Sequence, residues 1–133
     1  MSRAKIPGVK RALALGLLLC ACSPVEAPTV DLSALDDTAD TQGPYPVEAH
    51  VTSRRSLTRV ELVFHEGDLP AARILMQADE LGIFRADLPG FGAGATVSYH
   101  VEALDDRDDR GYGPERAAAR PGCGAELCFH VLP

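Results

Sequence analysis

Histidine and glutamate side chains could meet on one face of a predicted sheet. His65, His100 and His130 alternate with the apolar residues of their strands, and Glu61 has the same phase. Neighbouring strands bring side chains to about 5 Å from each other, and zinc takes imidazole and carboxylate ligands. If the strands are neighbours, Glu61, His100 and His130 form a row that could hold a metal or share a proton. The alternative is that outward strand positions simply accept polar residues.

A run of acidic residues offers oxygen ligands for a hard cation such as Ca²⁺. Its aspartates are Asp105, Asp106, Asp108 and Asp109. The run departs from the EF-hand pattern D-x-[DN]-x-[DN]-G, because the aspartates come in adjacent pairs separated by arginine. A loop cation site competes here with a solvated turn in which the arginines at 107 and 110 neutralise the acids.

Nucleophilic catalysis finds little support in this chain. Ser53 and Ser56 fall in an arginine-containing turn and Ser98 falls within a strand, none of them in a G-x-S-x-G elbow. Lysine is absent after Lys10, which excludes Schiff-base chemistry and the phosphate-loop lysine from the rest of the chain. We therefore predict that the protein is not an enzyme and needs no cofactor.

Apolar residues alternate with polar ones from Pro44 onward, which is typical of half-buried strands. Glycine and proline separate the strands, and no segment shows helical periodicity. This pattern predicts one all-β domain over residues 44–133, an antiparallel sandwich of about six to seven strands. The inward sets are Val47/Ala49/Val51, Val60/Leu62/Phe64, Ala72/Ile74/Met76, Phe84/Ala86/Leu88, Val97/Tyr99/Val101/Ala103 and Leu127/Phe129/Val131.

Three segments of this domain resemble the Ig-like, fibronectin-type-III-like modules of bacterial surface and secreted proteins. They are Val60-Glu-Leu-Val-Phe64, Gly82-Ile-Phe-Arg-Ala-Asp-Leu-Pro89 and Gly94-Ala-Thr-Val-Ser-Tyr-His-Val-Glu-Ala-Leu-Asp105. The resemblance covers residues 44–106 and implies an Ig-like sandwich. It implies no activity, because such modules serve as spacers, adhesive domains and binding appendages alike.

The N-terminus carries the features of a secretory signal. Four basic residues and no acid precede an apolar run from Ala12 to Ala21, which is too short for a transmembrane helix of roughly 20 residues. Leu19-Cys20-Ala21-Cys22 resembles the lipobox of bacterial lipoproteins. The resemblance implies a signal peptide over residues 1–21, lipidation of Cys22 and, from Ser23, sorting to the outer membrane. An ordinary signal peptide is the alternative.

The remaining cysteines are Cys123 and Cys128, since Cys20 leaves with the signal and Cys22 takes the lipid. A disulfide is the default in an oxidising compartment. We predict a structural bond that joins the long connection after Gly111 to the last strand.

The mature chain is strongly acidic. Removal of four of the 13 basic residues and none of the 19 acids leaves a charge of 9 − 19 = −10, which argues against nucleic-acid binding. Residues 22–43 hold five of these acids, no base and few large apolar groups. We predict that they form a flexible acidic tether between the lipid and the domain.

These features predict a non-catalytic lipoprotein that is anchored in the outer membrane and presents one monomeric Ig-like interaction or structural module. Arg54, Arg55 and Arg59 could contact an envelope protein or a polysaccharide. One alternative is a small metal- or ligand-binding lipoprotein that uses the histidine face. Another is an accessory subunit of an envelope assembly, which an outward apolar patch around Val63, Leu75 and Leu104 would favour.

Overall fold

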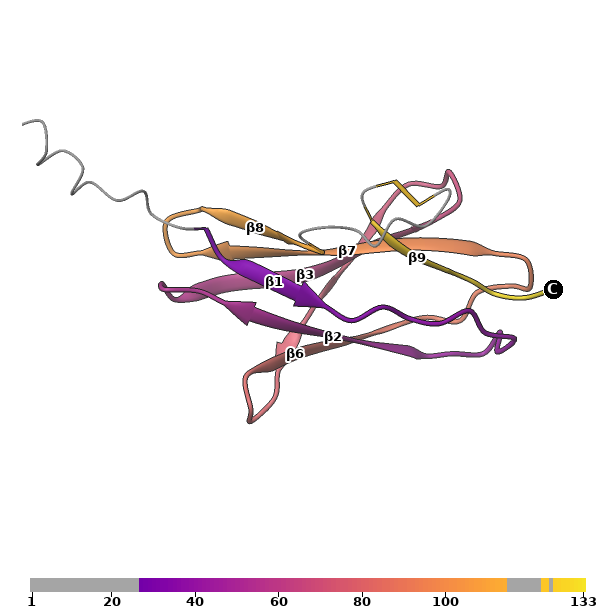
Figure 1. Cartoon of the computed structure of the whole chain (residues 1–133), viewed down its shortest axis with the longest axis horizontal. Helices are drawn as coiled ribbons and strands as arrows, with labels where there is room; N and C mark the ends of the chain where they lie inside the picture. The colour runs from indigo at the N-terminus through magenta and orange to yellow at the C-terminus, as the bar shows by residue number, and fades with distance from the viewer. Residues whose placement is uncertain (1–26, 115–122, 125) are drawn as a thin grey trace, which may run out of the picture.

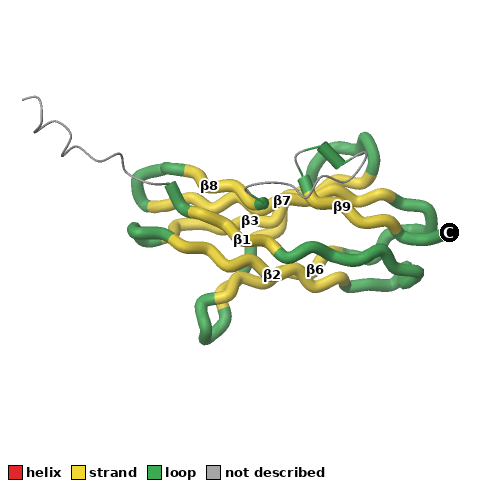
Figure 2. The backbone as a smooth tube through the Cα atoms, in the orientation of Figure 1, coloured by secondary structure: helices red, strands yellow, loops and turns green. Residues whose placement is uncertain are grey.

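The computed structural model describes residues 27–114, 123–124 and 126–133. Within these ranges the chain is built of strands and loops, without helix (Figure 2). Two antiparallel sheets pack face to face, so the predicted β-sandwich is confirmed. The described residues form nine strands, more than the six sets that alternation indicated.

The first sheet has the strand order β1-β2-β6-β5. The second has the order β4-β3-β7-β8, and β9 also pairs with β7. Figure 1 shows the two layers with the last strands, β8 and β9, beside β7. The strands are β1 (Thr29–Leu32), β2 (Tyr45–Thr52), β3 (Leu57–Glu66), β4 (Ala72–Leu75), β5 (Gln77–Ala78), β6 (Ile83–Leu88), β7 (Thr96–Asp105), β8 (Arg110–Gly113) and β9 (Leu127–His130).

The core lies between the sheets and contains the predicted inward sets except for Ala72, which is exposed. Side chains at alternate positions of β7, from Val97 to Ala103, are fully buried. In the β3–β7 register Leu62 lies opposite Val101 and Phe64 opposite Tyr99. Directly opposite residues point to the same face of a sheet, so these pairs enter the core together.

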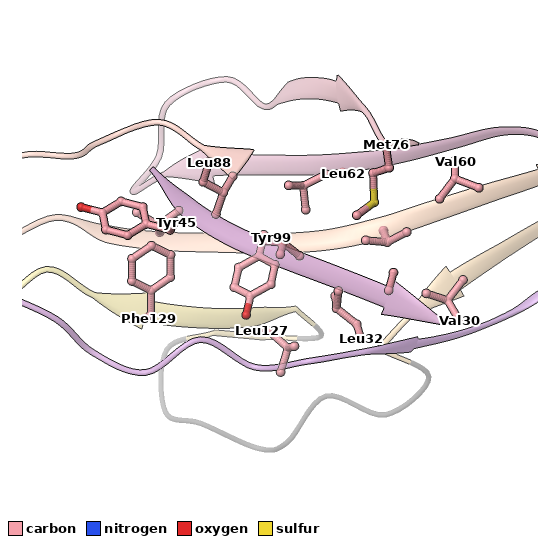
Figure 3. Packing of buried hydrophobic residues seen from close by; sticks show 14 of the residues in the cluster. Val30, Leu32, Tyr45, Val60, Leu62, Met76, Leu88, Tyr99, Leu127 and Phe129 are labelled. Atoms are coloured by element: carbon pink, nitrogen blue, oxygen red, sulfur yellow. The ribbon is translucent and has the colours of Figure 1, made fainter. Parts of the chain in front are cut away.

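Aromatic rings fill one end of the core. The ring of Phe129 lies 5.2 Å from that of Tyr45 and 6.2 Å from that of Tyr99, both edge to face. Figure 3 shows these three rings between the layers, with Leu88 close by. Edge-to-face contacts of this kind add to the free energy of area burial, which anchors the last strand to the first sheet.

The segment that we predicted as a tether is largely part of the domain, which corrects its boundary at residue 44. Residues 29–32 form β1, which pairs with β2 from Thr29↔Thr52 to Leu32↔Ala49. Val30 and Leu32 are buried in the core. Two inward apolar residues in alternation are enough to add a strand when a partner edge is available, although the segment as a whole is acidic.

Residues 33–43 are also tied to the sandwich. The Tyr99 hydroxyl accepts the Leu35 N–H at 2.8 Å and donates to the Ser33 carbonyl at 3.2 Å. Thr38 forms a parallel bridge with Val131. The carboxylate of Asp40 accepts the N–H groups of Gln42 and Gly43. Acids of the predicted tether thus serve as turn acceptors inside the fold.

Candidate functional site

The predicted row of Glu61, His100 and His130 is not formed, which overturns this metal hypothesis. His100 lies opposite Val63, and Glu61 lies opposite Glu102. His130 lies opposite Thr96, four residues along β7 from His100, or about 13 Å at 3.3 Å per residue. The prediction assumed that the three residues lie at the same level on three neighbouring strands. Instead, β9 pairs with residues 96–99 of β7, the half of the strand that precedes His100.

His100 instead meets His65 through Glu126, a residue that the sequence did not single out. His65 Nε2 lies 2.8 Å from Glu126 Oε1, and His100 Nδ1 lies 2.6 Å from Glu126 Oε2. His100 Nε2 lies 2.9 Å from Glu102 Oε2. We call His65, Glu126 and His100 the histidine bridge. It lies on the outer face of the second sheet.

Each member of the bridge comes from a different element. His65 stands near the end of β3 and His100 in the middle of β7, both at positions that alternate with core residues. Glu126 stands within the loop closed by Cys123 and Cys128. A residue in a loop has no strand phase, so periodicity could not have placed Glu126 here.

Hydrogen bonds within the bridge shift the pKa values of His65 and Glu126. The hydrogen bond to Glu126, followed by the Gly67 carbonyl, raises the pKa of His65 above 6.5. Burial alone would raise the pKa of Glu126, but hydrogen bonds from His100 and His65 outweigh it and leave that pKa below 4.5. Opposite charges therefore stabilise each other at this site.

Arginines extend this set of ion pairs across the sheet. Glu102 accepts from Arg73 at 3.0 Å and from Arg110 at 3.2 Å. Glu61 lies 3.3 Å from Arg73 and 3.7 Å from Arg59. Glu61 and Glu102 are thus paired with arginines from β3, β4 and β8.

The acidic loop does not form the predicted cation site. Asp105 is fully buried, and its Oδ1 accepts the N–H groups of Arg107 and Asp109 at 2.8 and 3.0 Å. Asp106 and Asp108 are exposed. Asp105 therefore organises the turn between β7 and β8. The solvated turn is also wrong for Asp105, because this carboxylate lies in the interior.

The disulfide between Cys123 and Cys128 is confirmed, with its Cα atoms 5.7 Å apart. Cys128 lies opposite Ser98 of β7, which has the outward phase of His100. The loop that the disulfide closes therefore belongs to the outer face, where it brings Glu126 to the two histidines.

Two of the three candidate contact arginines are engaged or partly covered: Arg59 pairs with Glu61, and the Nε atom of Arg55 is buried. Of the three residues at outward apolar positions, Val63 is buried, Leu104 half-buried and only Leu75 exposed. They do not form a continuous exposed apolar patch.

Within the described parts of the chain, no three His, Cys, Asp or Glu side chains are placed to hold a metal ion. The same parts contain no helix long and apolar enough to cross a membrane. Comparison with known proteins finds neither a family model nor a curated protein that matches this sequence. Cys22, the predicted lipidation site, lies outside the described residues.

Proposed function

We propose that this protein is a non-catalytic lipoprotein of the bacterial cell envelope, anchored in the outer membrane through Cys22. Its sandwich acts as a binding or structural module for an envelope protein or a polysaccharide. The proposal is supported by the Leu19-Cys20-Ala21-Cys22 motif and by a folded domain that begins almost directly behind it. An acylated cysteine supplies the two signals that stable anchoring requires.

The main structural support for this proposal is the short stretch of chain between Cys22 and the first strand. The first strand begins at Thr29, seven residues after the predicted lipid attachment point. Seven residues span at most about 25 Å when fully extended. The lipid would therefore hold the sandwich close to the head groups rather than at the end of a long tether.

The anchor is tested by fractionating cells that express the wild-type protein, Cys22→Ala or Cys20→Ala. We expect the wild type and Cys20→Ala in the membrane fraction, with a mature mass that matches a lipidated chain starting at Cys22. Cys22→Ala should lose the lipid mass. An unlipidated wild-type chain that begins at another residue would disprove the proposal.

The distance to the membrane is tested with the lipidated protein on a supported bilayer by neutron reflectometry. We expect protein density directly next to the head groups. A flexible Gly/Ser insert of 20 residues between Glu26 and Ala27 should move and broaden this density away from the bilayer. Equal profiles for the two proteins would contradict the close attachment.

The metal-binding alternative loses its basis with the row of Glu61, His100 and His130. The accessory-subunit alternative loses the apolar patch that favoured it, because Val63 is buried. Neither alternative has an observation of its own in the described residues.

A further inference from the structure

The histidine bridge has an unusual distribution of hydrogen-bond acceptors. His65 Nδ1 lies 2.8 Å from the carbonyl oxygen of Gly67, and His65 Nε2 faces Glu126. A carbonyl and an ionised carboxylate only accept hydrogen bonds. Both ring nitrogens of His65 must therefore donate, which requires the doubly protonated, positively charged imidazole.

His100 also faces an acceptor at each ring nitrogen. Its Nδ1 faces Glu126 and its Nε2 faces Glu102, at 2.6 and 2.9 Å. A neutral imidazole carries one N–H, so one of these two contacts would bring a lone pair against a carboxylate oxygen. The arrangement is satisfied in full only when His65 and His100 are both charged.

The charges around the bridge favour this state. Asp68, in the turn after β3, attracts the charge on His65. Glu102 faces His100 from the same strand and is itself held by Arg73 of β4 and Arg110 of β8. From β8, the ring of Tyr112 lies 6.4 Å from that of His100.

Glu126 is the link between this charge state and the position of a loop. The Glu126 side chain is 23% exposed and contacts both rings. Its backbone N–H donates to the Cys123 carbonyl at 3.2 Å inside the disulfide loop. Together with the disulfide, the two imidazole contacts of Glu126 hold the described part of this loop to the sheet.

We propose that the histidine bridge is a pH-dependent fastening that holds Glu126 of the Cys123–Cys128 loop on the sheet while His65 is protonated, and loosens it when His65 loses its proton. Loss of this proton replaces a charge-assisted hydrogen bond by a weaker or repulsive contact. The loop then loses the Glu126 contacts with the outer face and keeps its attachment through β9.

The direction of the pH effect follows from His65. A group whose pKa is raised in the folded state stabilises it fully below the unfolded-state value and loses this contribution as the pH rises through the folded-state value. The fastening should therefore be complete below pH 6.5, the ordinary value of the group, as long as Glu126 stays ionised, and it should weaken above pH 6.5.

The test follows the His65 imidazole ¹⁵N signals and the backbone amide signals of Gly124 and Glu126 by NMR, using the unlipidated chain from Ser23 with its disulfide intact. Below pH 6 we expect both nitrogens of the His65 imidazole to be protonated. The Gly124 and Glu126 amides should then shift with the same midpoint as His65, above pH 6.5. A His65 imidazole with one protonated nitrogen below pH 6 would overturn the proposal.

Two variants separate the bridge from a general pH effect. In Glu126→Gln the loop amides should no longer shift with the histidines, because the shared carboxylate is gone. His130→Gln is the matched control, since His130 Nδ1 contacts Thr96 Oγ1 at 3.0 Å and lies outside the bridge. It should keep the wild-type titration of the loop.

A zinc titration completes the experiment. One equivalent of Zn²⁺ should leave the imidazole and loop signals unchanged at pH 6. Saturable loss of imidazole protons on zinc addition would assign the site to a metal instead of protons, and the proposal would be wrong. Loop shifts that persist in Glu126→Gln would also overturn it.

Discussion

Tyr99 connects the core to the N-terminal segment through its hydroxyl group. Its ring is fully buried, and burial raises the pKa of the hydroxyl to about 12, so the group stays protonated and able to donate. This one hydroxyl satisfies the Leu35 N–H and the Ser33 carbonyl. Tyr99 is therefore both a core residue and the point at which residues 33–35 are attached.

Tyr99→Phe should lower the free energy of unfolding by about 1–2 kcal/mol, because two partly buried backbone groups lose their partner. Urea unfolding followed by circular dichroism measures this change. Tyr112→Phe is the matched control, since Tyr112 is exposed, and we expect it to change stability by less than about 0.5 kcal/mol. Equal effects of the two substitutions would contradict the role of the Tyr99 hydroxyl.

Asp105 has a structural role that its acidic neighbours do not share. Asp105→Ala should destabilise the domain by about 1–3 kcal/mol, since the Arg107 and Asp109 N–H groups lose their acceptor. Asp106→Ala, at an exposed position, should be nearly neutral. Thermal unfolding with and without millimolar Ca²⁺ should give the same midpoint for the wild type. A calcium-dependent increase would restore the loop cation site.

Strand β8 is the element that lets the N-terminal strand close the sandwich. A Cβ atom on Gly111 would lie 1.8 Å from the Pro28 carbonyl oxygen, and one on Gly113 would lie 2.4 Å from Val30 Cγ1. The glycines recur at every second position, so both face β1. Their missing side chains allow the edges of the two sheets to approach each other.

Gly111→Ala should therefore displace β1, because the Cβ atom would meet backbone that cannot rotate away. We expect a loss of about 1–3 kcal/mol in the free energy of unfolding and faster hydrogen exchange of the Val30 and Leu32 amides. Gly92→Ala is the control, since a Cβ atom there meets nothing within 4 Å. Unchanged exchange in Gly111→Ala would contradict the close packing of β1.

The acid side of the stability curve depends on ion pairs across the molecule. Burial raises the pKa of Glu102, but hydrogen bonds from His100 and Arg73 outweigh it and leave that pKa below 4.5. The pKa of Asp79 is lowered chiefly by the Ile83 N–H. Carboxylates with lowered pKa values contribute stability above their ordinary values, and this is lost as the pH falls through the folded-state values.

Stability should therefore decrease as the pH falls below about 4.5, where the unfolded chain takes up protons first. Urea unfolding at a series of pH values measures the slope. Glu102→Gln should give a shallower slope than the wild type, because it removes a carboxylate whose pKa is lowered in the folded state. An equal slope in both proteins would show that the ion pairs of Glu102 do not govern acid stability.

The alternation of apolar and polar residues was enough to predict that the chain forms sheets, but not which strands lie at their edges. Val60, Leu62 and the β7 residues repeat with period two, and burial of one face makes that period readable. β1 was missed because its two inward apolar residues lie in the acidic segment predicted as a tether, and β5 because it has only two residues. For β8 the signal was two glycines, which have no side chain to alternate.

The candidate site, too, was predictable from the sequence only in part. That His65 and His100 face outward follows from strand phase, and the pairing of Cys123 with Cys128 follows from cysteine count and compartment. The meeting of both histidines at Glu126 depends on long-range register and on a loop position, and neither leaves a periodic signal. The row with His130 failed because β8 and β9 divide one side of β7 between them.

Composition and alternation therefore determine an acidic, all-β chain with a signal-like N-terminus and a single cysteine pair behind Cys22. The folded arrangement alone settles that residues 29–43 belong to the domain, that Asp105 is interior, and that Glu126 joins two histidines. The reason is physical: side-chain phase is local, whereas strand register, edge pairing and loop placement are set by packing between residues far apart in the chain.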